Sequence, residues 1–280
     1  QEFTMVKFNE LISELERKYN IENLLVNLIK SSGIWVNVEY FDKVINVTGK
    51  TKEEIMNVTD FYSYGIRENI RKEYDAKLDI ETEKVTQNSI NLISAIKENN
   101  ISVIKNILEN EIVDMNFKDI NYITALMIAA EEGNVDVVKL LLDAGAVVNA
   151  VNKYGRTALM TAAGKGYSDV VNLLLEKDVE VDAVDEDGET ALMLAAMDGR
   201  VNVVNLLLDS GARVNTADDG GTTALMHAAM DGYVNVVKIL LVNRADVNAI
   251  SEYGKTALMT AAEWGHTEVV KILLDSGAVV

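Results

Sequence analysis

Thr190-Ala-Leu-Met-Leu-Ala-Ala-Met-Asp-Gly199 is one copy of a phrase that recurs along this chain from residue 124 onward. Its first four residues, Thr-Ala-Leu-Met, occur five times, and each occurrence begins 33 residues after the one before. A fixed period of roughly 20–50 residues is the sequence signature of a repeat array, in which each unit buries its apolar face against its neighbours. The five copies begin at Thr124, Thr157, Thr190, Thr223 and Thr256.

The pattern of one copy predicts two short antiparallel helices and a projecting turn. The threonine hydroxyl caps the first N–H groups of a helix, and alanine, leucine and methionine extend that helix. Gly199 ends it by taking the left-handed conformation that other residues resist. The second helix, expected over Val201–Asp209, carries valine and leucine on a face so broad that it must be buried between neighbouring units. Asp185-Glu-Asp-Gly188 forms the tight polar turn between two units.

The pattern shared by the copies resembles the ankyrin repeat. It reads T-A-L-M-x-A-A-x-x-G, then x-x-x-V-V-x-(L/I)-L-L and usually G-A-x-V-N, where the family has T-P-L-H, A-A-x-x-G-H, V-V-x-L-L-L and G-A-x-x-N at the same offsets. The resemblance implies an all-α solenoid of helix-turn-helix units with projecting turns. Five ankyrin-like repeats fill residues 118–280, as Asp119–Val151, Asn152–Val184, Asp185–Ala217, Asp218–Ile250 and Ser251–Val280.

Some copies depart from the family pattern at positions that matter for packing. Tyr122 occupies the turn position that glycine holds in the other copies, and Arg244 and Asp178 stand where glycine closes the second helix elsewhere. A side chain held at positive φ costs on the order of 1 kcal/mol, unless the turn takes another shape. Methionine replaces the family's histidine in every copy, and we interpret this stripe as filler of the core or inner groove: Met127, Met160, Met193, Met226 and Met259.

Upstream of the clear repeats the pattern weakens. Residues 85–117 align with the repeat but have lost its small residues, so we interpret them as a degenerate N-terminal capping repeat. Residues 5–84 combine helical spacing with aromatic side chains, which predicts a small mainly helical domain of no family that we recognise. Because the degenerate repeat has apolar residues to cover, we expect 5–84 to dock on the solenoid. Gln1–Thr4 are interpreted as an expression scar before a natural start at Met5.

The composition of the chain argues against several classes of protein. Without cysteine, disulfides, thiol catalysis and thiolate metal sites are impossible. The net charge is −18 at pH 7 and lies mostly on the repeats, so we expect binding neither to nucleic acid nor to a membrane surface. No apolar run of about 18 residues is present that would span a bilayer. The expected location is the cytoplasm, with a secreted effector as the alternative.

Few residues carry catalytic chemistry. Gly49-Lys50-Thr51 is similar to the end of a phosphate-binding loop but lacks the earlier glycine, so we interpret it as a simple loop. His266 is expected at the start of a second helix, and His227 as a partly buried substitution within a first helix. Acidic pairs such as Glu186/Asp187 are typical of solvated turns. We therefore expect no catalytic residue, no cofactor and no metal site.

The surface positions of the repeats vary while their framework does not. In proteins that this chain resembles, partners bind along a concave groove formed by the turn tips and the exposed side of the first helices. At the matching positions the second unit is basic, the third and fourth are acidic, and the fifth carries an aromatic pair. The alternative is drift among solvated positions. The predicted partner-binding residues are Tyr122, Lys153, Tyr154, Arg156, Lys165, Glu186, Asp187, Glu189, Met197, Asp198, Asp219, Met230, Asp231, Tyr253, Lys255 and Trp264.

These observations predict a non-enzymatic module that binds a protein partner, one with a basic contact face, through the groove of the repeats. One alternative places an unrecognised catalytic or toxin-like activity in 5–84, with the repeats as a targeting scaffold; another makes 5–84 only a structural cap. The fifth unit keeps the apolar pattern of an interior unit. We therefore expect either further repeats beyond Val280 in the natural protein or self-association through this end of the solenoid.

Overall fold

The computed structural model describes residues 82–280, and those from Val85 to Val280 form one compact unit. Within this described part, twelve helices pair into helix-turn-helix units, an all-α arrangement consistent with the predicted solenoid. None of these helices is both long and apolar enough to cross a bilayer. The expression scar, the predicted helical domain up to residue 81, its docking and the Gly49-Lys50-Thr51 loop all lie outside the described residues.

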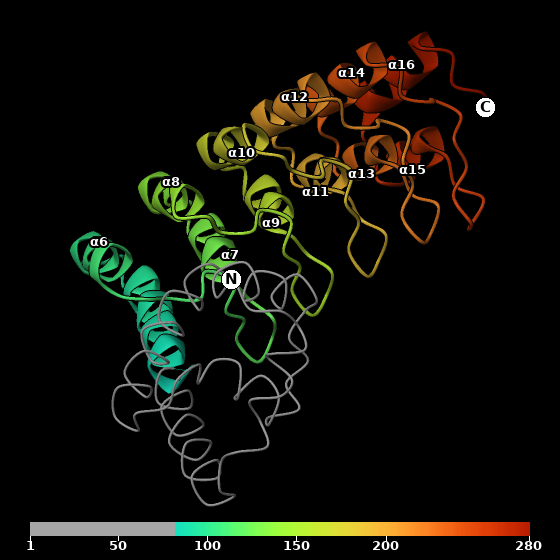
Figure 1. Cartoon of the computed structure of the whole chain (residues 1–280). Coiled ribbons are helices and arrows are strands. Elements are labelled where there is room, and N and C mark those ends of the chain that lie inside the picture. The colour runs from blue at the N-terminus through green and yellow to red at the C-terminus, as the bar shows by residue number, and fades with distance from the viewer. Residues whose placement is uncertain (1–81) are drawn as a thin grey trace, which may run out of the picture. The chain divides into compact units, whose positions relative to one another are not determined.

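The helices form two layers, with the first helices of the units in one and the second helices in the other (Figure 1). The first helices are α7 (Ala125–Glu131), α9 (Ala158–Lys165), α11 (Ala191–Met197), α13 (Ala224–Met230) and α15 (Ala257–Glu263). The second helices are α8 (Val135–Asp143), α10 (Ser168–Leu175), α12 (Val201–Asp209), α14 (Val234–Val242) and α16 (Thr267–Asp275). A helix over 82–97 and α6 (Ile101–Asn110) make the pair that precedes them.

The helix ends follow the sequence signals. Each repeat threonine caps its first helix; the hydroxyl of Thr190, for example, accepts a hydrogen bond from the Met193 N–H at 3.3 Å. Gly199 closes α11 in the left-handed conformation, with φ of 66°. The predicted second helix over Val201–Asp209 is confirmed as α12.

The three positions that lack the usual glycine behave differently from one another. Tyr122 and Arg244 adopt the left-handed conformation, with φ of 59° and 67°. The turn of the first unit therefore keeps the shape of the other turns, and the backbone is strained at both residues. Asp178 does not adopt it. The second helix of that unit, α10, ends at Leu175, and the chain leaves it by a different path. A missing glycine is thus accommodated either by strain or by an earlier helix end.

The buried apolar residues of all the units form one continuous core through the stack. Ala195 and Ala196 are fully buried and let the second helix approach closely, and Val203, Val204 and Leu207 fill the space from α12. Four of the five stripe methionines are buried, which confirms their place in the core, whereas Met259 in the fifth unit is 47% exposed. Leu274 of the same unit is 44% exposed, whereas Leu258, Val269 and Leu273 are buried.

Candidate partner-binding surface

The projecting turns are shaped by the residue that opens each of them. The Oδ1 atom of Asp218 accepts hydrogen bonds from the N–H groups of Gly220 at 2.9 Å and Thr222 at 2.7 Å. Asp185 closes the preceding turn in the same way, and Asp119 and Asn152 the two before it. A short side chain that bonds its own backbone two and four residues on holds a tight turn without help from other units.

Neighbouring turns are then tied together through their backbones. Four hydrogen bonds of 2.9–3.0 Å join successive tips, from Lys153 N–H to Asn121 C=O, Glu186 to Tyr154, Asp219 to Asp187, and Glu252 to Gly220. The tips therefore keep a fixed register, and the side chains on them are presented by a rigid frame. We call the exposed surface that these tips form with the ends of the first helices the turn-tip surface. Its turns are residues 120–123, 153–156, 186–189, 219–222 and 252–255. It also includes the last two residues of each first helix and the residue that follows them.

Four predicted aromatic residues stand out from this surface. Tyr253 is 82% exposed, Trp264 63%, Tyr122 57% and Tyr154 54%. The Nζ atom of Lys153 lies 4.8 Å from the centre of the Tyr154 ring, a cation–π contact. Large aromatic side chains that are solvent-exposed in the folded protein are frequent anchors of protein interfaces.

The basic character that the sequence predicts for the second unit is reduced in the structure. The guanidinium of Arg156 reaches forward to the third unit, with Nε 2.9 Å from Asp185 Oδ2 and Nη2 3.0 Å from Glu189 Oε2. Lys153 donates to the Asn121 side chain at 2.7 Å and remains exposed, as does Lys165. In the fifth unit, Lys255 forms an ion pair of 2.7 Å with Glu263.

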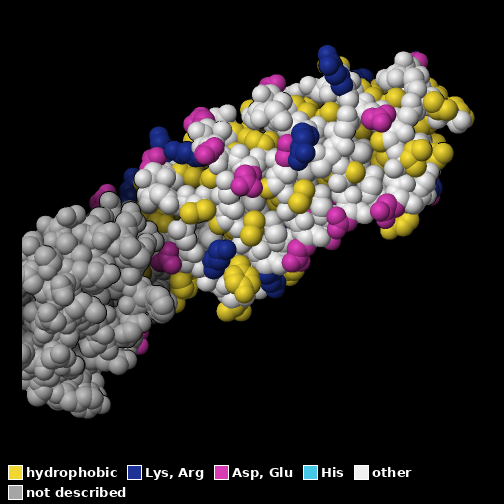
Figure 2. Space-filling model, turned by 45° about the vertical axis from the view of Figure 1, so that its right-hand side comes forward, with side chains coloured by type: hydrophobic (Ala, Val, Ile, Leu, Met, Phe, Trp, Pro, Cys, Tyr) yellow, Lys and Arg dark blue, Asp and Glu magenta, His cyan; other side chains and the backbone are white. Residues whose placement is uncertain are grey.

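The acidic run of the third and fourth units is largely free. Glu186, Asp187, Asp198, Asp219 and Asp231 are exposed, and none of them forms an ion pair with another residue of the described part. The half-buried side chains of Met197 and Met230 precede two of these acids in sequence. Figure 2 shows acidic side chains dispersed among hydrophobic ones on the visible face of the described unit. Such a mixture offers both charge and apolar area to a partner.

Two titratable groups beneath the tips are perturbed. His227 is buried more fully than its sequence position indicated, and its Nε2 lies 3.4 Å from Asp218 Oδ2, while neither ring nitrogen has a hydrogen-bond partner. Burial lowers the pKa of His227, although the charge of Asp218 opposes this. Burial, followed by the charge of Asp185, raises the pKa of Glu189 despite the neighbouring Arg156.

Acidification should therefore destabilise the protein through His227. Because the folded state lowers the pKa of His227 below its ordinary 6.5, the unfolded chain takes up a proton first as the pH falls. The stability contributed by the neutral ring is complete above pH 6.5 and is lost as the pH falls through the folded-state pKa. In His227→Leu, which carries the residue found at Leu194, we expect a shallower loss of unfolding free energy between about pH 7 and 5.

Urea unfolding at several pH values measures this difference. Glu189 affects the pH dependence of the unfolding free energy in the opposite direction, because its raised pKa favours the folded state on acidification. Since Glu189 is present in both proteins, its contribution cancels in the comparison. Parallel curves of unfolding free energy against pH for the two proteins would contradict the assignment.

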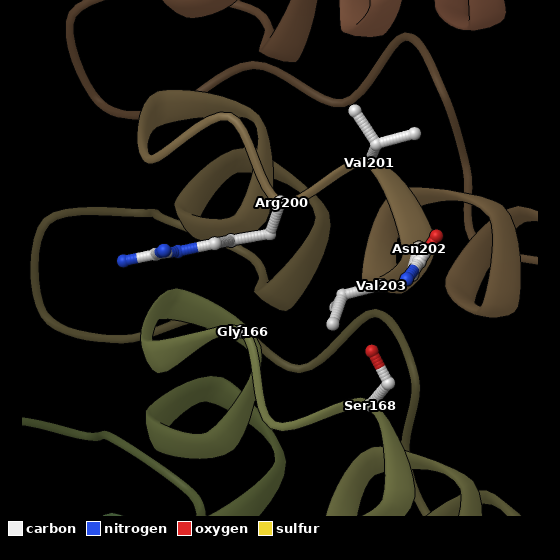
Figure 3. Close-up of a pocket in the computed structure, with 6 residues that line it drawn as sticks. All are labelled: Gly166, Ser168, Arg200, Val201, Asn202 and Val203. Carbon is white, nitrogen blue, oxygen red and sulfur yellow. The ribbon is translucent and has the colours of Figure 1, made fainter.

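One pocket of the described part lies at the starts of two second helices, and of its lining residues only Gly166 belongs to the turn-tip surface. It has a volume of about 230 Å³ and is lined by Gly166, Ser168, Arg200, Val201, Asn202 and Val203, at the starts of α10 and α12 (Figure 3). Arg200 points away from Val203 and donates from Nε to the Gly164 carbonyl at 2.9 Å. The lining offers a single hydroxyl without a carboxylate or imidazole beside it, so it supplies no acid–base pair.

Three carboxylates come close enough together to hold a cation. One oxygen from each of Asp185, Asp187 and Glu189 lies within 4.8 Å of the others. Arg156 already pairs with two of them, so a guanidinium supplies the positive charge at this place. Sequence reasoning missed this cluster and its relation to Asp218 and His227. The available signal was the charge reversal, one period apart, between Arg156 and Glu189.

Comparison with known families agrees with the geometry. A family model described as ankyrin repeats, in three copies, matches residues 92–185, 144–218, 177–251 and 215–280. The match therefore extends into 85–117, the segment interpreted as a degenerate repeat. No curated protein matches the chain.

Proposed function

Because the chain belongs to the ankyrin repeat family, whose repeats typically mediate protein–protein interactions, we propose that it is a non-enzymatic module whose turn-tip surface binds a protein with a basic contact face. The observation that carries this proposal is the set of unpaired carboxylates on tips held in register by backbone hydrogen bonds. The alternative activity in 5–84 depends on residues almost wholly outside the described part.

Charge and apolar area have separate roles in this proposal. Glu186, Asp187, Asp198, Asp219 and Asp231 create a negative potential that accelerates encounter with a basic partner and disfavours acidic ones. The exposed rings of Tyr253 and Trp264 supply the area that keeps the partner bound. Since the frame is fixed, little conformational entropy is lost on binding, which favours affinity.

The test begins with the intact protein as bait and identification of its partner by mass spectrometry. Reversing Glu186, Asp187 and Asp198 to lysine should then slow association by about tenfold or more and weaken its dependence on salt, because steering by the surface potential is lost. Surface plasmon resonance at several salt concentrations measures both quantities.

A matched control reverses Glu176, Asp209 and Asp275, three exposed acids at or just after the ends of second helices. It changes the net charge by the same amount while leaving the turn-tip surface intact. The association rate of this control should stay near that of the unaltered protein. Equal rates for both triple variants would show that the turn-tip surface is not where the partner binds.

A further inference from the structure

One notch between two turns is filled by a guanidinium from the chain itself. Arg156 lies between the second and third units, and its fork satisfies Asp185 at 2.9 Å and Glu189 at 3.0 Å. The side chain of Asp185 is 1% exposed, and its oxygens are engaged by this contact and by the N–H groups of its own turn. A planar guanidinium between two carboxylates is the charge-assisted arrangement that lysine cannot reproduce.

The next notch has the same frame and the opposite charge. One period after Arg156 stands Glu189, and one period after Asp185 stands Asp218. The two positions that form an ion pair in the preceding notch are therefore both carboxylates here, and Glu189 already accepts from Arg156. Burial, and after it the charges of Asp185, Asp187 and Asp218, raise the pKa of Glu189, while the charge of Arg156 opposes this.

A buried histidine beneath this notch gives a second and independent sign of a missing counter-charge. The side chain of His227 is 9% exposed, both of its ring nitrogens lack a hydrogen-bond partner, and Nε2 lies 3.4 Å from Asp218 Oδ2. Asp218 Oδ1 is engaged in its own turn, whereas Oδ2 has no guanidinium of the kind that Asp185 has. Buried polar groups are ordinarily satisfied, so an unsatisfied ring beside an unbalanced carboxylate requires an explanation.

We propose that the notch formed by Asp187, Glu189 and Asp218, above His227, binds an arginine side chain of the protein partner. This rests on the proposed function and names the chemistry that the partner must present. The arriving guanidinium pairs with Asp218 as Arg156 pairs with Asp185 one unit earlier, whereas Thr222 stands one period after Glu189. Glu189 and Asp218 retain 14% and 13% exposure of their side chains and Asp187 is exposed, so the carboxylates are reachable from the tips. The ring nitrogens of His227 are not, which argues against a metal ion held by the imidazole.

An acetylated tri-arginine amide is the probe, and the full-length chain labelled at histidine is the target. With only two histidines in the sequence, the ring signals are simple to assign by NMR. His227 reports on the notch, and His266, whose Nε2 lies 2.8 Å from the Met230 carbonyl oxygen, is the internal reference. We expect a saturable shift of the His227 signals alone. Glu189→Gln and Asp218→Asn should each weaken binding of the peptide by about tenfold, the loss typical of one charge-assisted contact.

Two features keep the test decisive. Asp218→Asn retains the oxygen that closes the turn, so its effect does not require a collapsed turn, and Asp209→Asn removes a charge of the same sign far from the notch and should change nothing. The inference is overturned if the His227 shift does not saturate, if tri-lysine produces an equal shift, or if Glu189→Gln leaves the shift intact. The peptide experiment needs no partner protein, so its result is separate from the test of the proposed function. That test is the association rate of the variant in which Glu186, Asp187 and Asp198 are reversed.

Discussion

Replacing Leu174 with alanine is expected to lower the free energy of unfolding by about 2–5 kcal/mol, the cost of a cavity at a site that cannot collapse. Leu174 is fully buried in α10, which packs on α8 and α12 as well as on α9 of its own unit. Each unit contacts only its neighbours, so a cavity here weakens the coupling of the second unit to both adjacent units. The array should unfold less cooperatively as well as earlier.

Leu175 is the matched control, because it is the next residue of the same helix and is only partly buried. Leu175→Ala should cost less than about 1.5 kcal/mol, since less apolar area is lost and the space opens toward solvent. Urea unfolding of the full chain followed by circular dichroism compares the two midpoints. Equal losses for both variants would mean that the second-helix layer is not packed as the structure has it.

The framework of the solenoid was predictable because its signals are local. The cap at Thr190, the left-handed Gly199 and the helix over Val201–Asp209 each depend on residues within one unit, and the 33-residue period then repeats them. Asp178 shows the limit of that reasoning. At the same aligned position Arg244 accepts strain and Asp178 avoids it, and the choice depends on how the preceding helix ends.

The side-chain network of the surface was not predictable to the same degree. Arg156 looked like a free basic group, yet it bonds two carboxylates that lie 29 and 33 residues further along. His227 looked partly buried, and its approach to Asp218 depends on the turn of its own unit folding back over its helix. Periodicity brings such positions near one another, but rotamers decide which of them pair. The identity of the partner is a property of another molecule.

Gly188→Ala should be among the most damaging small substitutions in the turns, with an expected loss of about 2–4 kcal/mol of unfolding free energy. Part of this is conformational, because Gly188 has φ of +77°, where a residue with a side chain is strained by about 1 kcal/mol. The larger part is contact with the next unit. A Cβ atom at Gly188 would lie 2.7 Å from the backbone nitrogen of Asp219, which donates the hydrogen bond to Asp187 that ties the third tip to the fourth.

Gly254→Ala separates the two contributions. Gly254 holds the same turn position in the fifth unit with φ of +72°, but a Cβ there meets no atom within 4 Å. Its alanine variant should therefore lose only the conformational part, about 1 kcal/mol. Denaturant unfolding gives both values, and hydrogen exchange at the Asp219 amide should be faster in Gly188→Ala alone. If the two variants lose equal stability, the tips are not in the tight register that the turn-tip surface requires, and a partner would have to order them on binding.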